Sequence, residues 1–245
     1  MNGTAELKYS DGLAGKESFF FKWLLKLGGD AAKKNGELLL ENLNLQSEIE
    51  RLKKVNFIDD TTGIHNKRYL QIRLREEFAR ARRHGFALSS VFIDLDDFKA
   101  INDTYGHITG DRLLREMASV LEGLCRSEDA LVRFGGEEFV VLMSDTKGYE
   151  AVALAERIRK EIAGHRFSCG DREISLSVSL GVSTFNDNDF RYVTNPEELI
   201  DMADRAMYRA KENGKNTTCY LPSHPGDDNP VPAGIAERHY ERIFV

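Results

Sequence analysis

The segment Arg133-Phe134-Gly135-Gly136-Glu137-Glu138-Phe139 joins two apolar runs, 131–134 and 139–143. Paired glycines accept positive φ angles at little cost, so Gly135-Gly136 predicts a hairpin turn between two strands. The two carboxylates, Glu137 and Glu138, then lie at the turn itself. A solvated acidic turn would have the same sequence, and these residues alone leave that interpretation open.

A second acidic segment, Asp94-Leu95-Asp96-Asp97-Phe98-Lys99, directly follows the apolar run 89–93. This β-branched and aromatic run predicts a buried strand that presents Asp94 at its C-terminal end. If this strand neighbours the hairpin, Asp94 converges with Glu137 and Glu138. Carboxylates that close repel one another, and all of them ionise at pH 7 only with a cation among them. Mg²⁺ takes such oxygen ligands together with substrate phosphates, so the two segments predict one metal and phosphate site.

Taken together, the two segments resemble the signature of the GGDEF family, the diguanylate cyclases, in its Gly-Gly-Glu-Glu-Phe form. The resemblance extends over about residues 57–220, because three further motifs occur in the family's order. They are Asp59–Arg68 near the start, Asn102–Asp111 in the nucleotide segment, and Ala203–Asn216 at the end. Such a set of landmarks is far more specific than any single motif.

Four positions depart from the family's pattern. Thr61 replaces the usual leucine and Lys67 replaces an arginine in the first motif, which affects the connection to the preceding segment more than catalysis. Asp97 adds an acid beside Phe98. Lys215 stands where arginine is commoner, and a lysine keeps the charge but loses the two-pronged geometry for phosphate.

The resemblance implies a fold and a reaction. The fold is α+β, a ferredoxin-like nucleotidyl-cyclase sheet akin to the polymerase palm, with helices against it. The reaction joins two GTP molecules into cyclic di-GMP and two pyrophosphates across a homodimer, because each protomer supplies one half-site. Asp94, the Leu95 carbonyl and Glu137 would hold two Mg²⁺ ions per half-site, with Glu138 assisting and Mn²⁺ as the alternative ion. Glu137 is expected to accept the proton, with Glu138 as its close rival.

The implied substrate contacts involve the base and the phosphates of GTP. Asp111 would pair with guanine, since a carboxylate only accepts hydrogen bonds and guanine presents N–H donors on its Watson–Crick edge. Adenine would leave a polar group unpaired at a cost of ~1–3 kcal/mol, which argues against a hybrid cyclase that makes mixed purine products. The alternative role of Asp111 is to cap the following helix. Lys211 and Lys215 would hold the β- and γ-phosphates. The full substrate set is Phe98, Lys99, Asn102, His107, Asp111, Lys211 and Lys215.

The segment Arg126-Ser127-Glu128-Asp129 lies shortly before the hairpin and resembles the family's inhibitory Arg-x-x-Asp motif. An arginine fork suits phosphate groups and guanine edges. The resemblance implies that Arg126 and Asp129 bind cyclic di-GMP and that the product inhibits the enzyme. Surface ion pairing is the ordinary alternative. A catalytically silent relative that binds cyclic di-GMP as a receptor is another, although the intact Gly-Gly-Glu-Glu-Phe argues against it.

Composition argues against several partner classes. The 245 residues include 34 Lys and Arg and 40 Asp and Glu, a net charge of −6, which argues against a nucleic-acid binder. The three cysteines form no metal-type spacing and indicate reduced thiols, as in a cytoplasmic protein. No transmembrane segment is expected, since no stretch approaches the ~20 apolar residues of a membrane helix and lysines interrupt the aromatic cluster 19–27. Residues 1–11 lack the basic start and apolar core of a signal peptide.

The chain is expected to divide into three parts. Residues 1–56 form an N-terminal extension, 57–221 the catalytic domain, and 222–245 an irregular tail that holds four of the five prolines. Within the extension, a heptad pattern predicts a parallel coiled-coil homodimer. A single amphipathic helix packed on its own domain is the alternative. The heptad leucines are Leu38, Leu45 and Leu52, each three positions after Asn35, Asn42 or Ile49.

Helices and strands are expected to alternate along the catalytic domain. Helices are predicted over 67–84, from about 110, over 150–163, and from Asn195-Pro196 to about 212. Strict alternation of apolar and polar residues predicts a half-buried strand over 173–182, and 217–221 is a last short strand. A central sheet with helices against it is an α+β sandwich.

Overall fold

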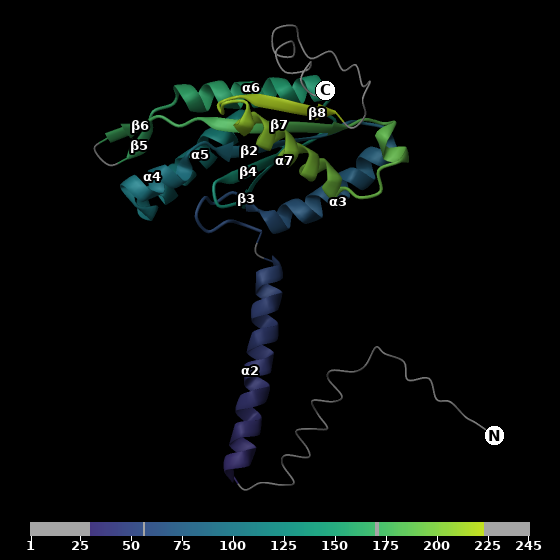
Figure 1. The fold of residues 1–245 in the computed structure, drawn as a ribbon. Coiled ribbons are helices and arrows are strands. Elements are labelled where there is room, and N and C mark those ends of the chain that lie inside the picture. Colours follow the sequence, from purple (N-terminus) through teal and green to yellow (C-terminus); the bar gives the residue numbers. More distant parts are fainter. Residues whose placement is uncertain (1–29, 56, 170–171, 223–245) are drawn as a thin grey trace, which may run out of the picture. The chain divides into compact units, whose positions relative to one another are not determined.

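A computed structural model describes residues 30–55, 57–169 and 172–222 of the chain (Figure 1). The chain forms two compact units, Met1–Asn56 and Phe57–Val245, and each is a separate body. The aromatic cluster 19–27 and the tail after Pro222 lie outside the described residues. Within the described ranges, no helix combines the length and apolar character that crossing a membrane requires.

The described part of the first unit is one helix, α2, which spans Asp30–Val55. Its sequence contains no proline and many residues of high helix propensity, which explains why the helix is uninterrupted. Leu38 and Leu45, two of the three heptad leucines, are 50% and 57% exposed. Within the described ranges, no other part of the chain covers the apolar surface of these two leucines.

The second unit is built on a six-stranded mixed sheet with the strand order β1-β3-β4-β2-β7-β8. β2 runs antiparallel to both of its neighbours, β4 and β7, and β3 is antiparallel to β4. The outer pairs β1–β3 and β7–β8 are parallel, and β5 and β6 form a separate ribbon. The strands are β1 His65–Asn66, β2 Leu88–Leu95, β3 Ala130–Gly135, β4 Glu138–Ser144, β5 Phe167–Cys169, β6 Arg172–Ile174, β7 Val178–Phe185 and β8 Thr218–Pro222.

Helices cover both faces of this sheet (Figure 1). Successive side chains of a strand point to opposite faces. In β2, Val91 and Ile93 pack in one apolar cluster with α5 and α6, whereas Leu88 and Phe92 pack in another with α3 and α7. This two-sided packing confirms the expected α+β sandwich. The helices are α3 Lys67–His84, α4 Phe98–Tyr105, α5 His107–Leu124, α6 Gly148–Gly164 and α7 Glu197–Glu212, with a 3-10 turn η1 at Asp189–Arg191.

The expectation of one half-buried strand over 173–182 is wrong in two respects. The range is divided between β6 and β7, and all eight residues of β7 are buried. The serines of β7 are buried because their hydroxyls find acceptors. Ser179 donates to Asp96 at 2.7 Å, and Ser183 donates to the Leu199 carbonyl oxygen at 2.6 Å. Within β7, the polar positions of the alternation are therefore buried and hydrogen-bonded, whereas Glu173 and Ser175 before it are exposed.

The helices after β2 differ from the sequence expectation. No helix was expected over the residues that form α4, and α5 begins at His107 and not near Gly110. Gly106 lies between the two helices with φ +82°, a conformation that glycine adopts readily. Since Gly106 is the N-cap of α5, Asp111 lies inside the helix. The alternative role of Asp111 as a helix cap is therefore wrong.

Cys125 and Cys219 are free thiols. Burial raises the pKa of Cys125 to about 12 and also raises the pKa of Cys219. Neither residue is therefore a reactive thiolate near neutral pH.

Candidate active site

The end of β2 meets the start of β4 at a cluster of carboxylates. Asp94 is the register partner of Glu138 across the antiparallel β2–β4 pair, and its side chain is 9% exposed. The Leu95 amide donates to the Glu137 carbonyl oxygen at 3.4 Å. The structure thus brings the acids of two segments that are distant in sequence to one end of the central strands.

The hairpin turn lies one residue later than the sequence indicates. Gly135 pairs with Glu138, so Gly136 and Glu137 form the turn between the strands. A register shift between Arg133 and Gly135 marks a bulge, which adds a residue to β3 and moves the turn along the chain. Glu138 is consequently the first residue of β4, where strand pairing fixes its position.

Burial raises the pKa values of two acids of the cluster, Asp94 and Glu138. Burial raises the pKa of Asp94 above its ordinary value, and the hydrogen bond from Lys211 offsets this only in part. Burial likewise raises the pKa of Glu138, and the negative charges of Asp94 and Asp204 raise it further. A raised pKa means that the charged form of the acid is incompletely compensated. A bound cation would supply that compensation, so the cluster favours cation binding.

The oxygen donors of this cluster fit Mg²⁺ or Mn²⁺. Among the described residues, no three His, Cys, Asp or Glu side chains are grouped closely enough to form a complete metal centre by themselves. Mg²⁺ at phosphate-binding sites takes one or two carboxylates and completes its coordination with water and substrate phosphates. Asp94, Glu137 and the Leu95 carbonyl offer oxygen donors of that kind at one strand end. A nucleotide would therefore complete the coordination.

Two lysines reach the same end of the sheet from the last turn of α7 and the loop after it. Lys211 Nζ lies 2.6 Å from Asp94 Oδ1, and Lys215 Nζ lies 2.6 Å from Asp97 Oδ1. Both lysine side chains remain partly exposed. They place positive charge beside the acids, where the phosphates of a nucleotide can be bound.

Asp96 is buried and holds the loop after α7. Its carboxylate accepts hydrogen bonds from the hydroxyls of Ser177 and Ser179, both at 2.7 Å, and from the Asn216 amide at 3.0 Å. These three hydrogen bonds compensate an acid that is 5% exposed. The two aspartates at 94 and 96 therefore differ in role, since the first belongs to the carboxylate cluster and the second anchors the fold.

The residues expected to contact guanine lie on α4 and α5. Asn102 Oδ1 is a buried atom without a hydrogen-bond partner among the residues that the structure describes, and a Cβ at Gly110 would lie only 1.9 Å from it. Gly110, which directly precedes Asp111 in the sequence, thus leaves room for the Asn102 amide. An unpaired buried oxygen is a ready acceptor for a ligand N–H. Of the other expected contacts, Phe98 is buried, whereas Lys99 and His107 are exposed.

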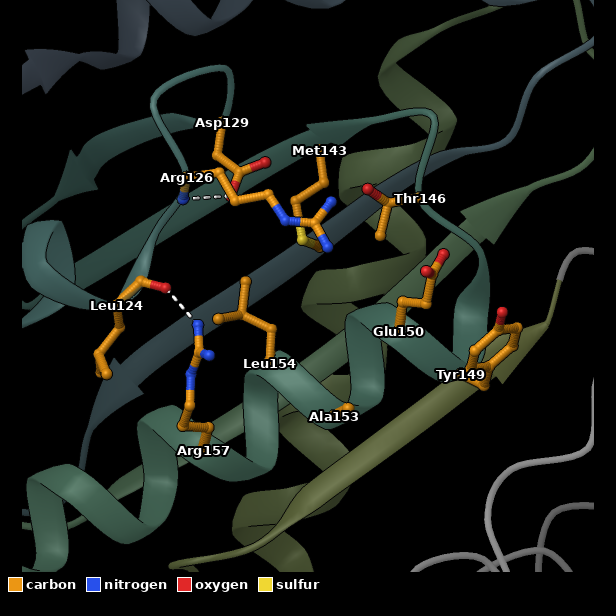
Figure 2. A pocket seen from close by; sticks show the side chains of 10 residues that line it. All are labelled: Leu124, Arg126, Asp129, Met143, Thr146, Tyr149, Glu150, Ala153, Leu154 and Arg157. Atoms are coloured by element: carbon orange, nitrogen blue, oxygen red, sulfur yellow. Dashed lines mark hydrogen bonds between the residues drawn. The ribbon is translucent and has the colours of Figure 1, made fainter.

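A separate cavity of about 440 Å³ lies between the end of α5, the loop before β3, and α6 (Figure 2). Arg126 and Asp129 both line it, and the Arg126 amide donates to Asp129 Oδ2 at 2.8 Å. Burial raises the pKa of Asp129. Arg157 of α6 lines the same cavity and donates to the Leu124 carbonyl oxygen, so two guanidinium groups border one hollow.

Arg157 is a candidate that the sequence did not indicate. α6 carries two arginines, and Arg159 instead pairs with Glu156 at 3.0 Å and donates to Asn216 at 3.1 Å. Both arginines are far in sequence from the Arg126–Asp129 motif. The helix period cannot tell which arginine faces the cavity, because that depends on how α6 packs.

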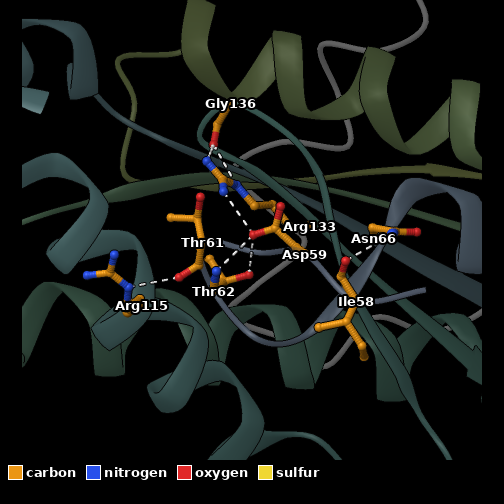
Figure 3. Close-up of polar contacts among 8 residues, drawn as sticks. All are labelled: Ile58, Asp59, Thr61, Thr62, Asn66, Arg115, Arg133 and Gly136. Atoms are coloured by element: carbon orange, nitrogen blue, oxygen red, sulfur yellow. Dashed lines mark hydrogen bonds and ion pairs between the residues drawn. The ribbon is translucent and has the colours of Figure 1, made fainter. Parts of the chain in front are cut away.

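Arg133 connects the start of the second unit to the hairpin turn (Figure 3). Its Nε and Nη2 donate to the Gly136 carbonyl oxygen at 3.0 and 2.8 Å, and its Nη1 donates to Asp59 Oδ1 at 2.9 Å. Burial raises the pKa of Asp59, but hydrogen bonds from Arg133 and Thr62 outweigh burial and lower the pKa overall. The segment that follows the junction between the units is thus linked to the turn that carries Glu137.

The family model described as "Diguanylate cyclase, GGDEF domain" matches residues 56–217. The match extends over most of the second unit, and the chain therefore belongs to the GGDEF family of diguanylate cyclases. The resemblance drawn from the motifs is confirmed.

Three similar proteins define the relationship further. The response regulator PleD of Caulobacter vibrioides is 39% identical over 175 residues, which are 70% of this chain and 37% of PleD. Diguanylate cyclase SiaD of Pseudomonas aeruginosa, solved in complex with its activator SiaC, has a TM-score of 0.63 at 30% identity, covering 85% of this chain and 76% of that chain. The active GGEEF domain of a diguanylate cyclase from Vibrio cholerae has a TM-score of 0.59 at 34% identity, and the match covers 63% of this chain and 96% of that domain. The chain spans little more than a third of the length of the curated relatives it matches.

Proposed function

We propose that this chain is a diguanylate cyclase, which joins two GTP molecules into cyclic di-GMP and releases two pyrophosphates. The observation that carries the proposal is the meeting of Asp94, Glu137 and Glu138 with Lys211 at one end of the central sheet. Such a site combines oxygen donors for a divalent cation with positive charge for phosphates. The active Vibrio cholerae domain is a GGEEF domain, the sequence form present here, which argues against a silent receptor.

In this proposal the carboxylate cluster holds the metal and accepts the proton. Asp94, the Leu95 carbonyl and Glu137 would hold two Mg²⁺ ions per half-site, with Glu138 assisting. When bound, these ions neutralise the triphosphate and lower the pKa of the ribose 3′-hydroxyl. Glu137 accepts the hydroxyl proton, and Glu138 is the close rival because its raised pKa favours proton uptake. The 3′-oxygen attacks the α-phosphate of the facing GTP, pyrophosphate leaves, and an equivalent second attack closes the ring.

The nucleotide is held at its base and at its phosphates. Asn102, with its unpaired buried Oδ1, and Asp111 accept hydrogen bonds from guanine N–H groups, a pattern that adenine does not supply. The ammonium groups of two lysines bind the β- and γ-phosphates, and main-chain groups at the start of α4 assist. The residues assigned to the phosphates are Phe98, Lys99, Lys211 and Lys215, and His107 is a further expected substrate contact whose alternative role is structural.

Incubation of the full chain with equal concentrations of GTP and ATP in the presence of Mg²⁺ tests this specificity. We expect cyclic di-GMP to be the only cyclic dinucleotide formed, as identified by mass, because Asp111 rejects adenine. Mixed or adenine dinucleotides would instead place the chain among the hybrid cyclases. Binding of cyclic di-GMP without consumption of either nucleotide would make it a receptor.

The proposed reaction requires two copies of the chain. One protomer offers one half-site, and two half-sites must face each other, so the enzyme is a two-fold homodimer. We assign residues 1–56 to dimerisation and 57–221 to catalysis. The described heptad leucines of α2 support this, because Leu38 and Leu45 leave apolar surface exposed that a second helix can cover.

We also infer that cyclic di-GMP inhibits the enzyme from the cavity at Arg126 and Asp129. Arg126 and Arg157 present two guanidinium groups there, which suit phosphates and guanine edges. Asp129 precedes β3, whereas the catalytic turn follows β3, and a strand of this length spans about 20 Å. A ligand in the cavity therefore does not compete directly with GTP. It shifts the population between productive and unproductive arrangements of the half-sites.

Substitution Arg126→Ala should relieve product inhibition and leave initial rates within about twofold of wild type. A hydrogen bond to a charged group contributes about 1.5–3 kcal/mol, so the inhibitory concentration of cyclic di-GMP should rise about tenfold or more. Progress curves with added cyclic di-GMP measure this shift. Arg82→Ala, at an exposed position near the end of α3, is the matched control and should inhibit like wild type. Unchanged inhibition in Arg126→Ala, or inhibition purely competitive with GTP, would rule out this cavity.

A further inference from the structure

One ion pair at the site joins two residues that both depart from the family's pattern. Lys215 Nζ lies 2.6 Å from Asp97 Oδ1. Asp97 is the N-cap residue of α4, yet its side chain makes no capping hydrogen bond. Its carboxylate accepts a hydrogen bond from the Lys215 ammonium group instead, and this contact raises the pKa of Lys215.

The main chain holds both partners in place. Asp97 has φ +58° and Lys215 has φ +64°, left-handed conformations that residues other than glycine adopt rarely. The Asn216 amide donates to buried Asp96 at 3.0 Å. The sequence neighbours of the two partners are thus hydrogen-bonded to each other, and the ion pair forms between anchored backbone positions.

The other lysine of the site, Lys211, contacts a different kind of acid. Its partner Asp94 belongs to the proposed metal ligands, so a bound cation would compensate Asp94 and leave Lys211 free for phosphate. Asp97 is outside that ligand set, and its side chain is 68% exposed. Lys215 therefore still faces a carboxylate when the nucleotide arrives.

We propose that Asp97 weakens the binding of the substrate's terminal phosphates by competing with them for Lys215. The inference rests on the proposed function, because the phosphates concerned are those of GTP. A lysine presents one compact charge with three N–H donors. A phosphate must displace the Asp97 carboxylate from this charge or share the charge with it. Asp97 thereby sets substrate affinity without contact to the reacting atoms.

The expected effect is modest, because the ion pair is exposed. The Asp97 and Lys215 side chains are 68% and 42% exposed, so solvent and salt screen their attraction. Removal of the carboxylate should tighten phosphate binding about two- to fivefold. The change should appear in KM while kcat stays nearly constant, as expected for an interaction equal in the ground and transition states.

Substitution Asp97→Asn is the matched change, since asparagine tolerates a left-handed backbone as aspartate does. Calorimetry on the full chain with Mg²⁺ and a GTP analogue that has a methylene bridge between the α- and β-phosphates measures affinity without turnover. We expect Asp97→Asn to bind this analogue about two- to fivefold more tightly. Binding of guanosine, which has no phosphate, should be unchanged. In a Lys215→Met background, Asp97→Asn should have no effect.

Asp145→Asn is the control variant. Asp145 is an exposed aspartate with φ +49° that follows β4, at the end of the strand opposite the acid cluster. Its substitution removes the same charge from the same backbone conformation and should leave the affinity for the analogue unchanged.

The outcomes separate the proposal from the function on which it rests. Equal or weaker binding of the analogue by Asp97→Asn overturns the proposal, and so does tighter binding that persists in the Lys215→Met background. Those results leave the proposed function standing, because the wild-type chain binds the analogue. If no variant binds the analogue, wild type included, the proposed function is wrong and the role of Asp97 falls with it.

Discussion

Replacement of Glu137 by glutamine is expected to lower kcat by a factor of about 10²–10⁴ and to leave the fold intact. Glutamine keeps the size of the side chain but removes the charge that binds metal and accepts the proton. The main chain of Glu137, not its carboxylate, bonds to Leu95. Strand pairing therefore does not depend on the substituted group. Release of pyrophosphate measures turnover, and a thermal melt measures the fold.

The control for this substitution is Glu161→Gln, at an exposed position on α6. This variant loses the same charge and should turn over GTP like wild type. Wild-type rates in Glu137→Gln would refute the role assigned to Glu137. If Glu138→Gln lost turnover while Glu137→Gln kept it, the rival acid, Glu138, would be the proton acceptor.

Polar replacement of the three heptad leucines, Leu38, Leu45 and Leu52, by serine should separate the dimer into inactive monomers. Burial of one leucine contributes about 1.5–3 kcal/mol, and each 1.4 kcal/mol is a factor of ten in an equilibrium constant. The dissociation constant of the dimer should therefore rise more than about a hundredfold. Activity should fall most at low protein concentration, because a monomer holds one half-site. Light scattering and activity across a dilution series measure both effects.

Leu43 provides the matched control for the leucine series, since it is 39% exposed on α2 but lies outside the heptad positions. Leu43→Ser should dimerise and turn over GTP like wild type. If the triple variant matched this control in mass and in activity, α2 would not form the dimer interface.

Local motifs made much of the fold and site predictable from sequence. The glycine pair and the apolar runs around it give a hairpin, and the helix over 67–84 has the bounds that its pattern predicts. The strand that ends in Asp94 lies beside the hairpin, as the convergence of three acids requires. For the hairpin and this helix, the deciding residues are neighbours along the chain, so their preferences add within one short segment.

Features set by tertiary contact were not predictable in the same way. The serines of β7 are polar but buried, because Asp96 and a backbone carbonyl from α7 accept their hydrogen bonds. Asp97 and Lys215 lie far apart in sequence, and no pattern in either segment indicates that they pair. Arg157 enters the cavity of Arg126 through the packing of α6. Such contacts depend on how elements assemble, which one segment does not encode.

The most direct test of the central claim is the product that the full chain makes from GTP and Mg²⁺. The product should have the mass of cyclic di-GMP, and two pyrophosphates should appear for each molecule formed. The rate per protomer should rise with protein concentration until the dimer is saturated. Unconsumed GTP, or GDP or a linear dinucleotide as the end product, would contradict the account.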